Sequence, residues 1–194
     1  MKYIFLDIDG VLNSDSDFRH PNGEPKARYP HILDYNGISD AKLRQLRRIY
    51  DSCGSGNCRI VLTSTWKVYL EQESSPYDSW FAKEAPRIKR YLLGKFRRQG
   101  IPIYGTTHAF EANWIDRPGG ILGFMKENGI PKGDILILDD EKFGYGEAGL
   151  LDRVIWTDYE KDGLTPELAD RAISLLNGDG GQEAGGEDTD GDVH

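Results

Sequence analysis

The chain begins with a run of apolar residues, Tyr3 to Leu6, that ends abruptly in Asp7-Ile8-Asp9-Gly10. Apolar β-forming residues followed by a glycine turn predict a buried parallel strand and its exit loop. Residues i and i+2 of a strand share a face, so Asp7 and Asp9 begin on the same side. Two carboxylates held there repel each other unless a cation or a shared proton intervenes. The pair therefore predicts a metal site at the end of the first strand.

Strand-like and helix-like segments alternate along the rest of the chain. We expect further strands at 59–65, 101–104, 135–138 and 153–157, and helices at 39–50, 79–98, 118–128 and 165–177. The helix 118–128 ends at Asn128-Gly129, with Pro131 just beyond, which is typical of a helix C-terminus. Alternation of this kind predicts an α/β fold, a Rossmann-like three-layer αβα sandwich around a mainly parallel sheet. Small flap or cap insertions would lie over the sheet.

Length and charge predict one folded domain followed by a tail. The 194 residues suit a single domain, which we place at residues 1–176. The net charge of −8 is carried largely by residues 177–194, which hold six acids and no Lys or Arg. This glycine-rich acidic segment cannot bury apolar surface, and we expect it to be disordered.

The same sequence favours a cytoplasmic protein without a membrane partner. There is no apolar run long enough to span a bilayer, and the short run after Lys2 leads into aspartates rather than into a signal-peptide cleavage site. Cys53 and Cys58 bracket a short loop, and in a cytosolic setting we expect free thiols there.

Three predicted strands end in reactive side chains. The first ends in Asp7 and Asp9, the second in the run 63–65, Thr-Ser-Thr, and the strand 135–138 in Asp139-Asp140. An Asp or Ser after a strand is often only a turn former or a helix cap. In open α/β sheets, however, ligands bind beyond the carboxyl ends of the strands. Carboxylates that converge there require a cation, and hard oxygen ligands of this kind suit Mg²⁺.

The chain resembles the haloacid dehalogenase (HAD) superfamily of phosphohydrolases. DIDGVLN is similar to its first motif, VLTSTW to its second and LILDDE to its acidic fourth motif, in the same order across residues 3 to about 176. The resemblance is strongest with small members that carry DGVLN, STW, RPGG, ILDDE and TDYEKDGLT elements. Those members include the phosphatase-like domain of multidomain RNA-repair proteins. The resemblance implies a Mg²⁺-dependent phosphohydrolase that forms an aspartyl-phosphate.

The resemblance also implies roles for the four aspartates. Asp7 would be the nucleophile that attacks phosphorus. Asp9 would be the general acid for the leaving oxygen and then the base that activates water. Its main-chain carbonyl would also hold Mg²⁺. Asp7, Asp9, Asp139 and Asp140 form the expected metal set. Within the Asp139-Asp140 pair, the family pattern favours Asp140 as the direct metal ligand, with Asp139 supporting it. Direct binding by Asp139 is the alternative.

The second motif leaves one alternative open. Adjacent residues in a strand face opposite sides, so only one of Thr63 and Ser64 can point at a phosphate, and the motif favours Ser64. Trp66 is predicted as a wall of the substrate pocket, with an ordinary core position as the alternative. The predicted substrate-binding residues are Gly10, Asn13, Thr63, Thr65 and Trp66.

A cation is also expected to stabilise the transferred phosphoryl group. A helix that precedes a parallel strand runs backwards, so its N-terminus lies at the catalytic edge. Arg117 is at that N-terminus. Lys126 lies about 13 Å further along at 1.5 Å per residue, and Lys132 precedes the strand, roughly 17 Å from its carboxyl end. We therefore predict Arg117, which can bind phosphate bidentately.

The substrate is the least determined feature. Residues 14–37 are polar and rich in Pro and Gly, and we interpret them as a flap over the active site. The segment 83–98 holds seven cations, which could follow a nucleic-acid backbone or form a solvated helix face. We favour a nucleotide or a nucleic-acid end as the substrate. The alternatives are another small phosphomonoester, such as a sugar phosphate, and a non-enzymatic receiver-like phosphoacceptor.

Overall fold

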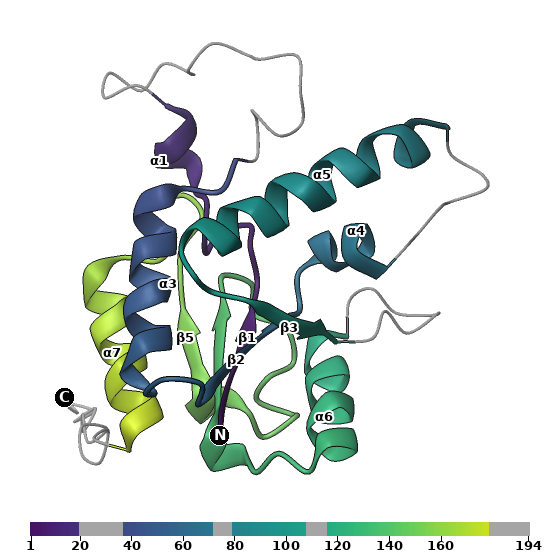
Figure 1. Ribbon diagram of the computed structural model, residues 1–194. Coiled ribbons are helices and arrows are strands. Elements are labelled where there is room, and N and C mark those ends of the chain that lie inside the picture. The colour runs from purple at the N-terminus through teal and green to yellow at the C-terminus, as the bar shows by residue number, and fades with distance from the viewer. Residues whose placement is uncertain (20–36, 72–78, 108–115, 179–194) are drawn as a thin grey trace, which may run out of the picture.

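The computed structural model describes residues 1–19, 37–71, 79–107 and 116–178 (Figure 1). Most of the predicted flap, residues 20–36, and nearly all of the predicted tail, residues 179–194, lie outside the described residues. No helix among the described residues is long and apolar enough to cross a membrane. Cys53 and Cys58 are both free, as expected.

Five parallel strands form one sheet in the order β3-β2-β1-β4-β5. They are β1 (Lys2–Leu6), β2 (Cys58–Leu62), β3 (Ile103–Thr106), β4 (Ile135–Asp139) and β5 (Val154–Trp156). β1 lies at the centre, where Leu6 pairs with Leu62 on one side and with Leu138 on the other. The strand order changes direction between β1 and β4, and such a switch point is where α/β sheets bind ligands. The α/β fold class is confirmed.

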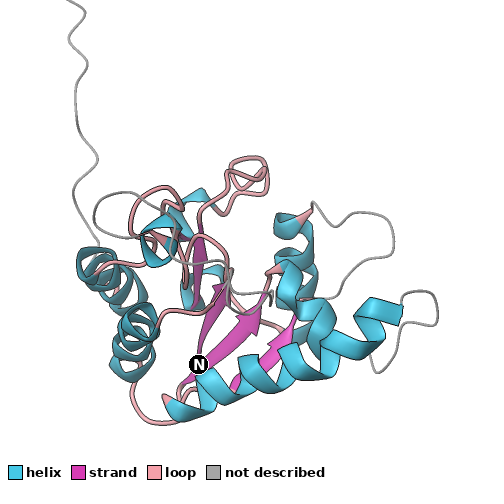
Figure 2. Ribbon diagram, turned by 90° about the horizontal axis from the view of Figure 1, so that it is seen from above, coloured by secondary structure: helices cyan, strands magenta, loops and turns pink. Residues whose placement is uncertain are grey.

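Helices cover both faces of this sheet (Figure 2). They are α1 (Asp15–Phe18), α3 (Asp40–Ser52), α4 (Val68–Glu71), α5 (Ser79–Arg98), α6 (Arg117–Asn128) and α7 (Pro166–Asn177). Side chains alternate across a strand, so Ile4 and Leu6 pack with α3, α5 and α7, whereas Phe5 packs with α6 on the opposite face. α3 and α7 lie side by side in both views.

Two element boundaries differ from the sequence prediction in a way that matters for the site. β2 ends at Leu62 rather than at Thr65, because Thr65–Lys67 forms a 3₁₀ turn in which Ser64 Oγ accepts a hydrogen bond from the Trp66 amide. α6 includes Arg117 as its first residue. Asp116 caps it by accepting a hydrogen bond from the Gly119 amide at 2.8 Å.

Candidate active site

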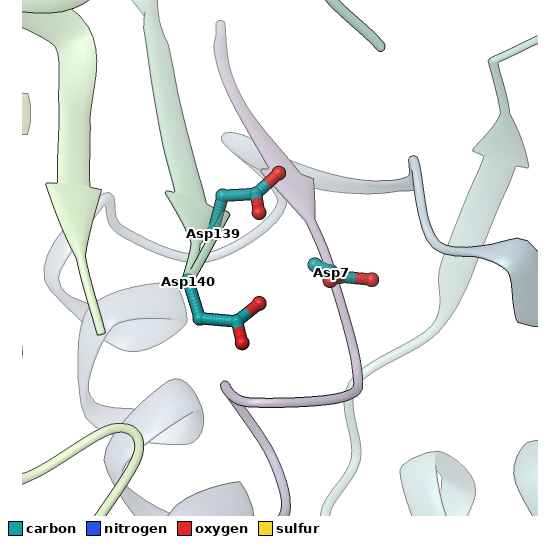
Figure 3. A group of neighbouring side chains, drawn as sticks. All are labelled: Asp7, Asp139 and Asp140. Carbon is teal, nitrogen blue, oxygen red and sulfur yellow. The ribbon is translucent and has the colours of Figure 1, made fainter. Parts of the chain in front are cut away.

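The carboxyl ends of β1 and β4 bring three aspartates together. Asp7 follows β1, Asp139 is the last residue of β4, and Asp140 follows it. Each of the three side chains offers an oxygen atom, and these atoms all lie within 4.8 Å of one another. Figure 3 shows the carboxylates gathered between the ends of the two strands. The predicted convergence of Asp7 with the Asp139-Asp140 pair is therefore present.

Burial makes this group of carboxylates costly without a cation. Burial is the largest cause that raises the pKa of Asp7 to about 7; Arg117 lowers this pKa, and the charge on Asp139 raises it further. Burial also raises the pKa of Asp140 to about 6, again assisted by Asp139. A cation among the three would favour their charged forms. Asp7 Oδ1 is buried without a hydrogen-bond partner among the described residues, so it is available as a hard oxygen ligand.

Arg117 places a positive charge beside this group of carboxylates. Its Nη1 lies 2.6 Å from Asp7 Oδ2 and 2.8 Å from Asp139 Oδ2. Its guanidinium carbon lies 4.5 Å from the centre of the Phe143 ring, which covers one face of the group. The start of α6 thus brings Arg117 to the catalytic edge, where the sequence placed it.

The two residues of the Asp139-Asp140 pair have different surroundings. Both oxygens of Asp139 are engaged: Oδ1 accepts from the Glu141 amide at 3.0 Å, and Oδ2 accepts from Arg117 and from the Tyr145 hydroxyl at 2.7 Å. Asp139 is fully buried, whereas Asp140 is half-buried. Asp140 is therefore better placed to give an oxygen to an incoming cation.

Gly10 makes room for the Asp140 carboxylate. Its φ of +74° is in the left-handed region, and a Cβ built on it would lie 2.1 Å from Cγ and Oδ2 of Asp140. Only a residue without a side chain lets the turn after β1 pass this close to the end of β4. The structure gives Gly10 this steric role beside the predicted role in substrate binding.

Asp9 is held apart from the group of three carboxylates. Its Oδ1 accepts a hydrogen bond from Asn13 Nδ2 at 2.8 Å, and its Oδ2 accepts one from Trp66 Nε1 at 2.9 Å. Asn13 in turn accepts from the Gly10 amide at 3.0 Å. Asn13 and Trp66 were predicted to bind substrate. In the structure they hold Asp9, and the Trp66 ring also belongs to the buried core.

The three hydroxyl residues after β2 take three different positions. Ser64 is fully buried, and its side chain is the smallest of the named causes that lower the pKa of Asp7. Thr63 Oγ1 is buried without a hydrogen-bond partner among the described residues. Thr65 is exposed. Ser64 is thus beside the predicted nucleophile, and the choice between Thr63 and Ser64 for phosphate binding stays a prediction.

Two residues near the site were missed in the sequence. Lys67 is half-buried, donates to Thr107 Oγ1 at 3.2 Å, and has a pKa lowered mainly by burial and further by the charge of Arg117. Its position directly after the Ser-Thr-Trp motif could have indicated that Lys67 lies near the site. Tyr145 is fully buried with its hydroxyl on Asp139. It lies in the irregular segment after β4, where no helical or strand-like pattern in the sequence indicates which side chains are buried.

Comparison with known protein families places this fold and site in the haloacid dehalogenase class, which supports a phosphatase-type function in general. Residues 3–169 match the family described as the HAD domain in Swiss Army Knife RNA repair proteins. The match covers most of the chain, so this protein belongs to that family, and the resemblance seen in the sequence is confirmed. No curated protein and no solved structure matches the chain.

Proposed function

We propose that this protein is a Mg²⁺-dependent phosphomonoesterase that works through an aspartyl-phosphate on Asp7. The observation that supports it most is the environment of Asp7. One carboxylate oxygen is bound by Arg117 at 2.6 Å, and the other is buried and without a partner among the described residues. The fixed cation favours the charged form that a nucleophile needs, and the oxygen without a partner is left for a metal ion.

The residues present fit a magnesium ion. Asp7 and Asp140 would hold it with carboxylate oxygens, and the main-chain carbonyl of Asp9 would be a third ligand. All three are hard oxygen donors, and Mg²⁺ usually takes one or two carboxylates and shares its remaining positions with water and phosphate oxygens. When bound, Mg²⁺ neutralises the charge on the phosphoryl oxygens and orients the phosphoryl group for in-line attack.

The chain's own residues carry out the proton transfers and the displacement. An oxygen of Asp7 forms a bond to phosphorus as the bond from phosphorus to the ester oxygen breaks. Asp9 gives its proton to that departing oxygen, and an alcohol leaves. Asp9 then removes a proton from water, whose oxygen bonds to phosphorus and releases inorganic phosphate and the Asp7 carboxylate. Arg117 would stabilise the charge of the phosphoryl oxygens in both steps.

The nucleophile assignment is tested by Asp7→Asn with p-nitrophenyl phosphate and Mg²⁺. We expect hydrolysis to be abolished and circular dichroism to be unchanged. Asp134→Asn is the matched control, because Asp134 lies before β4 at the opposite end of the strand and pairs with Lys2. Wild-type activity in Asp7→Asn would exclude this nucleophile. A stable phosphorylated Asp7 without phosphate release, seen by mass spectrometry, would favour the receiver-like phosphoacceptor.

We further propose that the substrate is a nucleotide or a nucleic-acid end. Two features support this: the family is named for a domain of RNA repair proteins, and Arg90, Arg97 and Arg98 of α5 are exposed. Exposed arginines on one helix can follow a phosphate backbone. Not all cations of α5 are free for this purpose, because Lys95 pairs with Asp40 at 2.7 Å.

The substrate class is tested by comparing mononucleotides, 3′- and 5′-phosphorylated oligonucleotides and sugar phosphates. Arg97→Gln with Arg98→Gln should raise KM for oligonucleotides and leave p-nitrophenyl phosphate hydrolysis unchanged. Arg48→Gln is the control, because this α3 arginine pairs with Asp170 of α7. Preference for sugar phosphates would contradict the nucleic-acid proposal and support the alternative small phosphomonoester.

A further inference from the structure

Tyr145 is a buried polar residue that the proposed mechanism does not use. Its side chain is fully buried, and its hydroxyl lies 2.7 Å from Asp139 Oδ2. The ring packs edge-on against Trp156 of β5, with centres 5.6 Å apart, and against Phe143, with centres 6.4 Å apart. Such packing leaves the ring little freedom, so the hydroxyl is held at one point in the site.

The contact has a defined direction. Burial and the neighbouring Asp139 raise the pKa of Tyr145, so the hydroxyl keeps its proton and donates a hydrogen bond to the Asp139 carboxylate. Asp139 Oδ2 therefore receives two donors, the Tyr145 hydroxyl and Arg117 Nη1, while Oδ1 receives the Glu141 amide. Two of these donors lie in the chain after β4 and the third begins α6, and together they determine how the Asp139 carboxylate is turned.

The position of Arg117 depends on that carboxylate. The same Nη1 atom lies 2.6 Å from Asp7 Oδ2 and 2.8 Å from Asp139 Oδ2, so the two carboxylates share one nitrogen. If Asp139 turned away, Arg117 would be left to pair with Asp7 alone. A tighter pair with the nucleophile would draw the guanidinium away from the charge that develops on the phosphoryl oxygens.

We propose that Tyr145 is a positioning residue for phosphoryl transfer, which acts through Asp139 to hold Arg117 in place. The inference deepens the proposed phosphatase function and rests on it. The Tyr145 hydroxyl is bonded to Asp139 and not to the proposed metal ligands Asp7 and Asp140. Its effect would reach the reaction through two contacts, Tyr145 with Asp139 and Asp139 with Arg117. Phe143 assists from the other side, with its ring 4.5 Å from the Arg117 guanidinium carbon.

The experiment removes only the hydroxyl, in Tyr145→Phe, and measures p-nitrophenyl phosphate kinetics. An interaction that acts in the transition state lowers kcat and leaves KM unchanged. We expect kcat to fall about tenfold, the size of effect that one displaced positioning contact produces. Tyr91→Phe is the matched control, because it deletes a hydroxyl that accepts from the Ile38 amide at 2.9 Å and belongs to α5. Its kcat should stay within about twofold of wild type.

A double-mutant cycle separates positioning from a general loss of structure. If Tyr145 acts through Arg117, adding Tyr145→Phe to Arg117→Lys should lower kcat by less than about twofold further. A tenfold loss in both backgrounds would show independent effects and overturn the inference. If the wild type is active and Tyr145→Phe has the same kcat and KM, the inference is overturned as well. A wild type without phosphatase activity would instead overturn the proposed function, and this inference with it.

A second variant covers the case in which Tyr145→Phe does not fold. Asp139→Asn keeps the shape of the side chain but replaces the charged carboxylate by a neutral amide. This weakens the hydrogen bond that residue 139 accepts from Arg117. It should lower kcat at unchanged KM, with circular dichroism like that of the wild type. Wild-type kcat in Asp139→Asn would overturn the inference as well.

Discussion

Replacing Gly10 by alanine perturbs the turn after β1 and the Asp140 carboxylate together. The new Cβ would lie 2.1 Å from Cγ and Oδ2 of Asp140 and 2.6 Å from its Cβ, so the whole side chain must move. Gly10 also has a φ of +74°, which a residue with a side chain adopts only with strain. The substitution thus has a backbone effect on stability and a local effect on the proposed metal site.

The two effects can be separated because they are measured in different experiments. The left-handed backbone costs roughly 1–2 kcal/mol, which lowers the melting temperature of a domain of this size by about 2–8 °C. Displacing Asp140 should weaken the apparent affinity for Mg²⁺ by roughly 10- to 100-fold, the range seen when the support of a metal ligand is disturbed. In free energy this is about 1.4–2.8 kcal/mol, similar to the first effect. The two are told apart by the assay: thermal denaturation reports the loss of stability, and a Mg²⁺ titration of activity reports the loss of affinity.

Gly56→Ala provides the control. Gly56 has the same φ of +74°, and a Cβ built on it meets nothing within 4 Å. Gly10→Ala should lose at least as much stability as Gly56→Ala in thermal denaturation, because the clash with Asp140 adds to the same backbone strain. Only Gly10→Ala should need more Mg²⁺ for half-maximal hydrolysis of p-nitrophenyl phosphate. A wild-type Mg²⁺ dependence in Gly10→Ala would refute the steric link between Gly10 and Asp140.

Three other outcomes are expected at this site. Because burial raises the pKa of Asp7 to about 7 from 3.8, the metal-free folded protein binds a proton more tightly than the unfolded chain. Its melting temperature should therefore fall as the pH rises from about 4 to 7, and Asp7→Asn should flatten this slope. Mg²⁺ should raise the melting temperature of the wild type at pH 8 but not that of Asp140→Asn, as differential scanning fluorimetry would show. Trp66→Phe keeps an aromatic ring and removes the donor to Asp9; steady-state assays should show kcat reduced about tenfold, and an unchanged kcat would contradict this role of the indole N–H.

The architecture was predictable because it depends on periodic patterns. The apolar runs that became β1, β2 and β4 are buried on both sides, and their continuous hydrophobicity marked them as central parallel strands. Helix ends were marked by local chemistry, such as the Thr165 cap of α7 and Gly178 after it. The end of β2 was not predicted, because it depends on a hydrogen bond between Ser64 and the Trp66 amide that competes with continued strand geometry.

The candidate site was predictable to the level of which segments meet. Parallel strands place their carboxyl ends at one edge, so Asp7 and the Asp139-Asp140 pair were expected at that edge. They approach each other because β1 and β4 are neighbours in the sheet. The direction of α6 placed Arg117 at the same edge. The partners of Asp9 were not predicted. Trp66 lies 57 residues from Asp9 in the chain, and whether its indole faces a carboxylate or only the core depends on side-chain packing.

The sequence by itself determined the fold class, the family and the edge of the sheet at which the acids lie, since the alternation of strands and helices and the motif residues after the strands are local patterns. The tertiary structure decided the division of roles among the acids at that edge. Asp139 is turned by donors from α6, from the chain after β4 and from its own turn, and Asp140 is left beside Gly10 and Asp7. The contacts of Arg117 with Asp139 and of Gly10 with Asp140 join residues distant in sequence, and their geometry depends on how the side chains pack once the sheet has formed.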